Sequence, residues 1–124
     1  MVFTNYAKNI VSIMIGSDLT NKHIQYFAVG AGSETINANT ETLTGSEFSR
    51  FLITGNPDFT TPKVVTFTGD INSVQASGLS LMQFGLFASG TKNTGSVYDI
   101  NQLNGSIVCD GTIELRFESA IQVI

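Results

Sequence analysis

The last segment of the chain carries its clearest structural pattern: residues 113–124 read Ile-Glu-Leu-Arg-Phe-Glu-Ser-Ala-Ile-Gln-Val-Ile. Apolar side chains occupy odd positions, at Ile113, Leu115, Phe117, Ile121 and Val123, and polar ones occupy even positions, at Glu114, Arg116, Glu118 and Gln122. A period of two is that of a β-strand with one face on a core and the other in water. We therefore expect a half-buried strand that runs to the last residue.

The segments before it repeat this character in shorter form. Apolar, branched and aromatic residues predict strands at 24–29, 48–54, 63–67, 79–88 and 96–103. The breaks between them hold turn residues, among them Gly30-Ala31-Gly32, Asn56-Pro57-Asp58 and Asn104-Gly105. About six strands with such frequent turns are typical of a mainly β fold, an antiparallel β-sandwich or a partly open barrel.

The N-terminal segment has helical spacing instead. Thr4 or Asn5 can cap a helix, because a short side-chain oxygen accepts a hydrogen bond from a free N–H of the first turn. Apolar residues then recur at intervals of three and four, at Tyr6, Ile10, Ile13 and Met14. We expect one amphipathic α-helix over about residues 4–15, and a single domain over residues 1–124, since this length suits one domain.

The composition is poor in charge. Charged residues make up 13% of the chain, about half the usual share, and the net charge is −4. Thr, Ser, Asn and Gly together fill 48 of the 124 positions. Six basic residues in an acidic chain leave no strong footprint for nucleic acid, and no apolar run is long enough to span a membrane. The N-terminus shows no secretory signal, so we expect synthesis and folding in a cytoplasm.

Three charged residues share the polar face of the last predicted strand. Arg116 lies between Glu114 and Glu118, where it can neutralise both carboxylates. A solvated ladder of charge pairs is one interpretation, and it would protect an edge strand against aggregation. The same charges could instead match those of a neighbouring subunit. A third interpretation makes the two carboxylates an acid–base pair of a glycan hydrolase.

A second charged pair, Glu47 and Arg50, lies three residues apart in a segment that can be helical or extended. A local ion pair is the simple interpretation, and a conformationally important pair at a subunit contact is the sharper one. These two residues, with Glu114, Arg116 and Glu118, are the candidate subunit-contact residues. We assign no catalytic, cofactor-binding or metal-binding residues, because His23 and Cys109 are alone and Gly30-Ala31-Gly32 lacks the rest of a dinucleotide motif.

The order of short motifs resembles that of a family of small bacteriophage virion proteins of the tail-fibre or baseplate-associated type. The motifs cover nearly the whole chain, at Thr4-Asn5-Tyr6-Ala7-Lys8, Ala28-Val29-Gly30-Ala31-Gly32-Ser33, Leu43-Thr44-Gly45-Ser46-Glu47-Phe48-Ser49-Arg50, Val65-Thr66-Phe67 and Gly85-Leu86-Phe87. One departure is Gln83, where such proteins often carry Glu, and the charge contact of the family does not carry over to that position.

The resemblance implies a structural virion protein without enzymatic activity, located in the particle. Expected partners are other virion proteins and further copies of this chain, in a homo-oligomer or symmetric array. Polar, uncharged surfaces suit this role because they cost less to desolvate than charges. Two alternatives stay open at this point. One is a capsid decoration protein on the head surface, and the other is a module that binds a host-surface glycan through Tyr6, Tyr26 or Tyr98.

Overall fold

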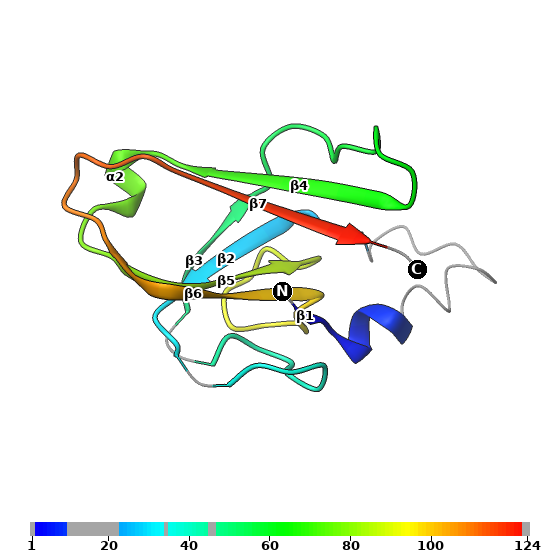
Figure 1. Ribbon diagram of the computed structural model, residues 1–124. Coiled ribbons are helices and arrows are strands. Elements are labelled where there is room, and N and C mark those ends of the chain that lie inside the picture. Colours follow the sequence, from blue (N-terminus) through cyan, green and yellow to red (C-terminus); the bar gives the residue numbers. More distant parts are fainter. Residues whose placement is uncertain (1, 10–22, 34, 45–46, 123–124) are drawn as a thin grey trace.

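A computed structural model describes residues 2–9, 23–33, 35–44 and 47–122 (Figure 1). It is mainly β, as predicted, with two antiparallel sheets that pack as a sandwich. The strands and the short second helix are β1 (Val2–Phe3), β2 (Tyr26–Gly30), β3 (Glu47–Leu52), β4 (Val64–Ile71), α2 (Ser73–Ala76), β5 (Ser80–Phe87), β6 (Asp99–Val108) and β7 (Leu115–Gln122). Five strands form one sheet in the order β1-β6-β5-β2-β3, and β4 pairs with β7 in the other.

The predicted C-terminal strand is β7, and its alternation is confirmed. Phe117, Ser119 and Ile121 are buried, whereas the even-numbered residues between and beside them are exposed. Strand β7 pairs with β4 over its full length, with Asp70 opposite Arg116 and Thr68 opposite Glu118. Figure 1 shows the two strands lying together across the larger sheet. The expected extension of the strand to Ile124 lies outside the described residues at its last two positions.

The larger sheet is covered on both faces, and this is why its central strands are so deeply buried. On one face, Phe27, Leu86 and Tyr98 belong to a core shared with Phe67 and Phe117 of the small sheet. On the other face, a second core is formed by Ala28, Leu43, Phe87, Val97 and Ile100. Leu43 and Val97 come from loops, so two loops take the place of a third layer on this face.

Gly69 allows a close contact between the two sheets. A Cβ atom at this position of β4 would lie 2.6 Å from ring carbons of Phe27 on β2. Real side chains do not tolerate that distance, so the absence of a side chain lets the strand pack directly on the aromatic ring. The tilted ring pair of Phe27 and Phe117, with centroids 6.3 Å apart, lies at the same boundary between the sheets.

The predicted N-terminal helix is described only in its first part, residues 5–9, and its predicted continuation lies outside the described residues. The Thr4 side chain caps it by accepting a hydrogen bond from the Ala7 N–H at 3.2 Å. The same hydroxyl donates to the Val97 carbonyl at 2.6 Å, and this bond ties the helix start to the segment just before β6. No helix in the described part of the chain has the length and apolar character needed to cross a bilayer.

One expectation about local structure was wrong, and one short helix was not predicted. Asn104-Gly105 lies inside β6 rather than in a turn after it. The turn residues do mark a break, because Leu81 pairs with Ile107 and Gln83 pairs with Gln102. Residues 103–106 of β6 therefore lie opposite Met82 of β5 alone, in a large bulge. The helix that was not predicted is α2. Its signal is a capping box, in which the Asn72 side chain accepts from Gln75 N–H and the Gln75 side chain accepts from Asn72 N–H.

Candidate functional site

Glu47 and Arg50 form a buried ion pair, and a β-bulge is what brings them together. Residues three apart on a regular strand point to opposite faces of the sheet. In β3, the pairing with β2 shifts between Val29 and Gly30, so that Ser49 pairs with Val29 and Glu47 pairs with Gly30. Phe48 is the extra residue, and it turns Glu47 onto the face that Arg50 occupies. Arg50 Nε then donates to Glu47 Oε1 at 2.6 Å.

The Arg50 guanidinium uses its remaining donors to hold a loop. Nη1 donates to the Ser89 carbonyl at 2.8 Å, and Nη2 donates to the Thr94 carbonyl at 2.6 Å. The flat group also stacks on the Phe87 ring, 3.7 Å from its centroid. Only 2% of the Arg50 side chain and 6% of the Glu47 side chain are exposed. The planar, five-donor geometry of arginine is what makes this combination possible.

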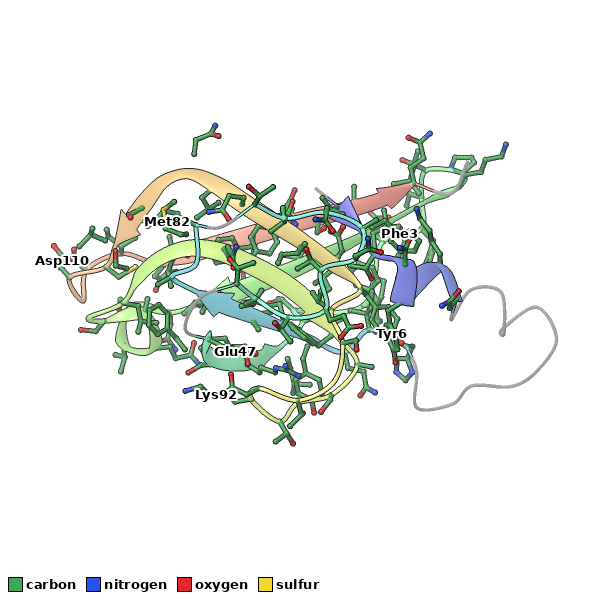
Figure 2. The ribbon with its side chains drawn as sticks, turned by 90° about the horizontal axis from the view of Figure 1, so that it is seen from below. Phe3, Tyr6, Glu47, Met82, Lys92 and Asp110 are labelled. Carbon is green, nitrogen blue, oxygen red and sulfur yellow. The ribbon has the colours of Figure 1, made fainter. Side chains whose placement is uncertain are left out.

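Glu47 completes the attachment of the same loop from the other side. Its Oε2 accepts a hydrogen bond from the Asn93 N–H at 2.5 Å, and Asn93 has a positive φ of 61°. Asparagine tolerates this conformation better than most residues do. Figure 2 shows Glu47 beside the loop that carries Lys92. The cluster therefore anchors the loop within the chain and leaves only a small cavity of about 140 Å³ beside it.

Gln83 holds the other covering loop, a structural role that no sequence pattern indicated. It is fully buried in β5. Its Oε1 accepts from the Thr44 N–H, and its Nε2 donates to Thr44 Oγ1 and Gln102 Oε1. Two of these bonds need an amide N–H, which a carboxylate lacks. The glutamine is therefore matched to this position, where glutamate would bring an unpaired buried charge.

The hydrogen-bonded partner of Arg116 is Asp70, while Glu118, beside it on the same strand, acts on Arg116 through its charge alone. The Arg116 Nε and Nη2 donate to Asp70 Oδ1 and Oδ2, at 2.7 and 3.2 Å, across the β4–β7 pairing. The hydrogen bond from Arg116 lowers the pKa of Asp70, and the Asp70 carboxylate raises the pKa of Arg116. The pair is open to solvent, with 65% of the Arg116 side chain and 37% of the Asp70 side chain exposed.

An open groove of about 400 Å³ lies beside this pair, at the end of the small sheet near α2. Its lining residues are Asp70, Ile71, Asn72, Glu114, Leu115 and Arg116. Glu114 therefore lies at this groove, and Glu118 lies two residues beyond Arg116 on the same exposed face. The structure thus brings three of the five candidate contact residues to one surface and places the other two inside a loop anchor on the larger sheet.

Asp99 is a third acidic site, and no sequence motif indicated it. It is fully buried in β6, and Ser119 of β7 donates to its Oδ2 at 2.5 Å. The other oxygen, Oδ1, accepts no hydrogen bond from the described residues. Burial raises the pKa of this carboxyl to about 6, against the partial opposition of the Ser119 hydrogen bond. Asp99 therefore couples the two sheets through a group that ionises near neutral pH.

The tyrosines considered for sugar stacking serve in packing. Tyr98 is buried, and its ring meets Tyr6 edge to face with centroids 5.3 Å apart. Tyr26 is packed against Gly90, where an added Cβ would come within 2.6 Å of the Tyr26 ring. Over the described residues, no group of three or more His, Cys, Asp or Glu side chains is placed to hold a metal ion.

Comparison of the chain with protein-family models, with curated proteins and with solved structures gave no match to any of them.

Proposed function

We propose that the chain is a non-enzymatic structural component of a bacteriophage particle that docks onto other virion subunits at the tail, baseplate or tail fibre. Two independent arguments support it. The ordered motifs resemble those of small virion proteins, and this supports the phage setting. The surface of the small sheet supports an assembly role, because it is polar, carries charges of both signs and is built on a strand with an open edge.

The observation that carries the assembly role is the position of β7. Among the described strands, β7 pairs with β4 alone, so one of its edges has no partner in the sheet. Proteins normally cover such an edge, or protect it with charges and irregularities, because it is ready to pair with another strand. A long, regular outer strand is therefore suited to form contacts between subunits.

The candidate carboxylates are poorly placed for glycan hydrolysis. Glu114 and Glu118 lie four residues apart along one strand direction, which separates their backbones by about 13 Å. Paired catalytic carboxyl groups in such enzymes lie about 5–10 Å apart. Arg116 lies between them on an exposed face, where water competes with every charge interaction. These features favour the structural interpretation of the three residues over the catalytic one.

A capsid decoration protein is the second candidate function, since a head lattice would use the same open strand. A glycan-binding module is the third, and it has less support because Tyr6 and Tyr98 pack against each other. Mass spectrometry of purified particles of the phage that encodes the chain tests the proposal, and we expect the chain at a constant ratio to a known tail protein. An electron-microscopy map of the particle separates tail from head. Absence of the chain from intact particles would overturn the proposal.

A further inference from the structure

We propose that the open edge of β7 binds a second copy of this chain, as an antiparallel strand pair in which Arg116 faces the partner's Glu118. The proposal rests on the assembly role proposed above and identifies the surface, the partner and the alignment of the two strands. It takes the charged residues of the small sheet as recognition elements in addition to their part in the monomer.

The direction of the free backbone groups follows from the contacts of β4. On the outer side of β4, Asp58 exchanges two backbone hydrogen bonds with Thr66, and the Thr68 carbonyl accepts from Thr54. The backbone N–H and C=O groups of the even-numbered β4 residues therefore point away from β7, and those of the odd-numbered residues point toward it. The β4–β7 register has no shift, and it pairs odd residues with odd residues and even residues with even residues.

The same alternation applies to β7. Its odd-numbered residues form the hydrogen bonds to β4, so the N–H and C=O groups of the even-numbered residues face the open edge. These residues are Arg116, Glu118, Ala120 and Gln122. Outside β4, no described residue makes a backbone hydrogen bond to them. Their side chains are exposed as well, so the edge offers both backbone groups and side chains to an incoming strand.

Charge and strand overlap together favour one alignment of two β7 strands related by a twofold axis. With the axis at Phe117, Arg116 of each copy faces the partner's Glu118, and Glu114 faces the partner's Ala120. Sliding one strand by two residues places Glu118 opposite the partner's Glu118, or Arg116 opposite the partner's Arg116. Like charges directly opposite each other are destabilising, and opposite charges are stabilising. An axis at Leu115 would also place Arg116 opposite a glutamate, Glu114, but Glu114 precedes β7, so that alignment pairs fewer residues of the strand. The alternating sequence of β7 therefore favours its own antiparallel copy with the axis at Phe117.

The existing ion pair leaves room for this contact. Arg116 uses Nε and Nη2 for Asp70, so Nη1 keeps its two donors for a second carboxylate. Glu118 faces Thr68 across the strands, and none of the described residues donates a side-chain hydrogen bond to its carboxylate. In the dimer, one row of side chains would run Asp70, Arg116 and the partner's Glu118. This row alternates in sign, and the twofold axis generates it twice.

A charge-exchange experiment tests the register. The basic variant, Glu118→Lys, places Arg116 opposite Lys in its own homodimer. The acidic variant, Asp70→Arg with Arg116→Asp, keeps an ion pair inside the chain but places Asp opposite Glu118 in its own homodimer. Sedimentation velocity should show dimers for the natural chain, monomers for each variant alone, and a heterodimer when the two variants are mixed. Circular dichroism and thermal unfolding of each variant confirm that it is folded.

Three results would overturn the proposal: a natural chain that stays monomeric at millimolar concentration, variants that each dimerise like the natural chain, or a mixture that stays monomeric. A monomer that binds another virion protein through β7 would assign the edge to a different partner. These results are distinct from failure of the proposed function, because a chain present in particles but monomeric in solution contradicts only the dimer.

A spin label at exposed Ala120 measures the alignment directly. In the proposed register, the two Ala120 positions are offset by six residues along the strands, or about 20 Å. The label is attached to an Ala120→Cys variant, and buried Cys109 is protected from the reagent. Double electron–electron resonance should give a distance near this value. A distance shorter than half of it would place the two Ala120 residues side by side and exclude the register.

Discussion

The described part of the molecule contains two ion pairs between arginine and a carboxylate, and their surroundings are opposite. Glu47–Arg50 lies under a loop of the larger sheet, with at most 6% of either side chain exposed. Asp70–Arg116 lies on the outer face of the small sheet, with 65% and 37% exposed. The Nε to carboxylate distances, 2.6 and 2.7 Å, are nearly the same. Distance alone therefore says little about what an ion pair contributes.

The two pairs differ in how much of their hydration they lose on folding. Removing Glu47 and Arg50 from water has a high desolvation cost, and the pair offsets it only because loop N–H and carbonyl groups complete the hydrogen bonding. Asp70 and Arg116 keep most of their hydration, so their attraction adds little to stability. The buried pair is fully committed within the chain, whereas the exposed pair is free to make a further contact. The following substitutions test this contrast.

The largest effect is expected for Arg50→Ala. It leaves the Glu47 carboxylate buried with one backbone donor and releases the loop carbonyls of Ser89 and Thr94. Breaking a buried pair in this way costs about 3–5 kcal/mol of unfolding free energy. Urea denaturation followed by circular dichroism measures it, with Arg116→Ala as the matched control. Equal losses for the two variants would contradict the contrast between the pairs.

Asp99 sharpens the comparison, because it is a buried carboxylate hydrogen-bonded by Ser119 rather than by a guanidinium. Its folded-state pKa is about 6, above the unfolded value of 3.8, so the native state binds its proton more tightly. The stability from this group is present below the unfolded value and is lost as pH rises through about 6. Two pKa units correspond to about 3 kcal/mol.

Asp99→Asn should remove this dependence. We expect the variant to be more stable than the natural chain at neutral pH, and the advantage to disappear as pH falls toward 4. Urea unfolding over this pH range provides the measurement, and Asp110→Asn, at an exposed turn, is the control. If the stability of the natural chain rises steadily from pH 5 to neutral, and the Asp99→Asn variant shows the same rise, the raised pKa of Asp99 is excluded as a source of pH dependence.

The next effect concerns the inner face of the strand that carries Asp70. Gly69→Ala would place a Cβ atom 2.6 Å from the Phe27 ring, and overpacking of this kind costs about 1–3 kcal/mol. Gly105→Ala is a suitable control, because nothing lies within 4 Å of its added Cβ. Thermal unfolding of both variants compares the two sites. We expect a lower midpoint of thermal unfolding for Gly69→Ala and an unchanged one for Gly105→Ala, because only the added methyl group at Gly69 meets a packed side chain.

The sequence predicted the strand that carries the exposed pair far better than the site of the buried one. Strand β7 is covered on one face only, so its alternation is visible in the residue order. Strand β5 is covered on both faces, and its burial hides the period of two. The structural role of Gln83 therefore had no visible pattern. The main partner of Arg116, Asp70, was not predicted because alternation identifies a face but not the adjacent strand.

The bulge at Phe48 explains why Glu47 and Arg50 could be identified as a pair but not placed. Their spacing of three suggests a helix or a coincidence, because a regular strand would separate them. The extra residue is defined by the register of β3 against β2, and that register depends on residues about twenty positions away along the chain. The large bulge at Asn104-Gly105 was unpredictable for the same reason. Turn residues indicate a break in a strand, but they do not show whether its pairing with the neighbouring strand resumes after the break.

The smallest effect is expected for the exposed pair itself. Asp70→Asn removes the charge partner of Arg116, yet both groups remain hydrated, so we expect a small loss of stability in dilute solution. Added salt should reduce that loss further, since it screens exposed charges. The stability that the pair contributes should also vanish in acid. The pKa of Asp70 is lower in the folded chain than the unfolded value of 3.8, so this stability is present above pH 3.8 and is lost as pH falls through the folded-state pKa. Unfolding of both chains at low and high salt measures this. A loss as large as that of Arg50→Ala, unchanged by salt, would mean that the small sheet depends on the pair for its fold, and would leave Arg116 unavailable as a contact residue for a second subunit.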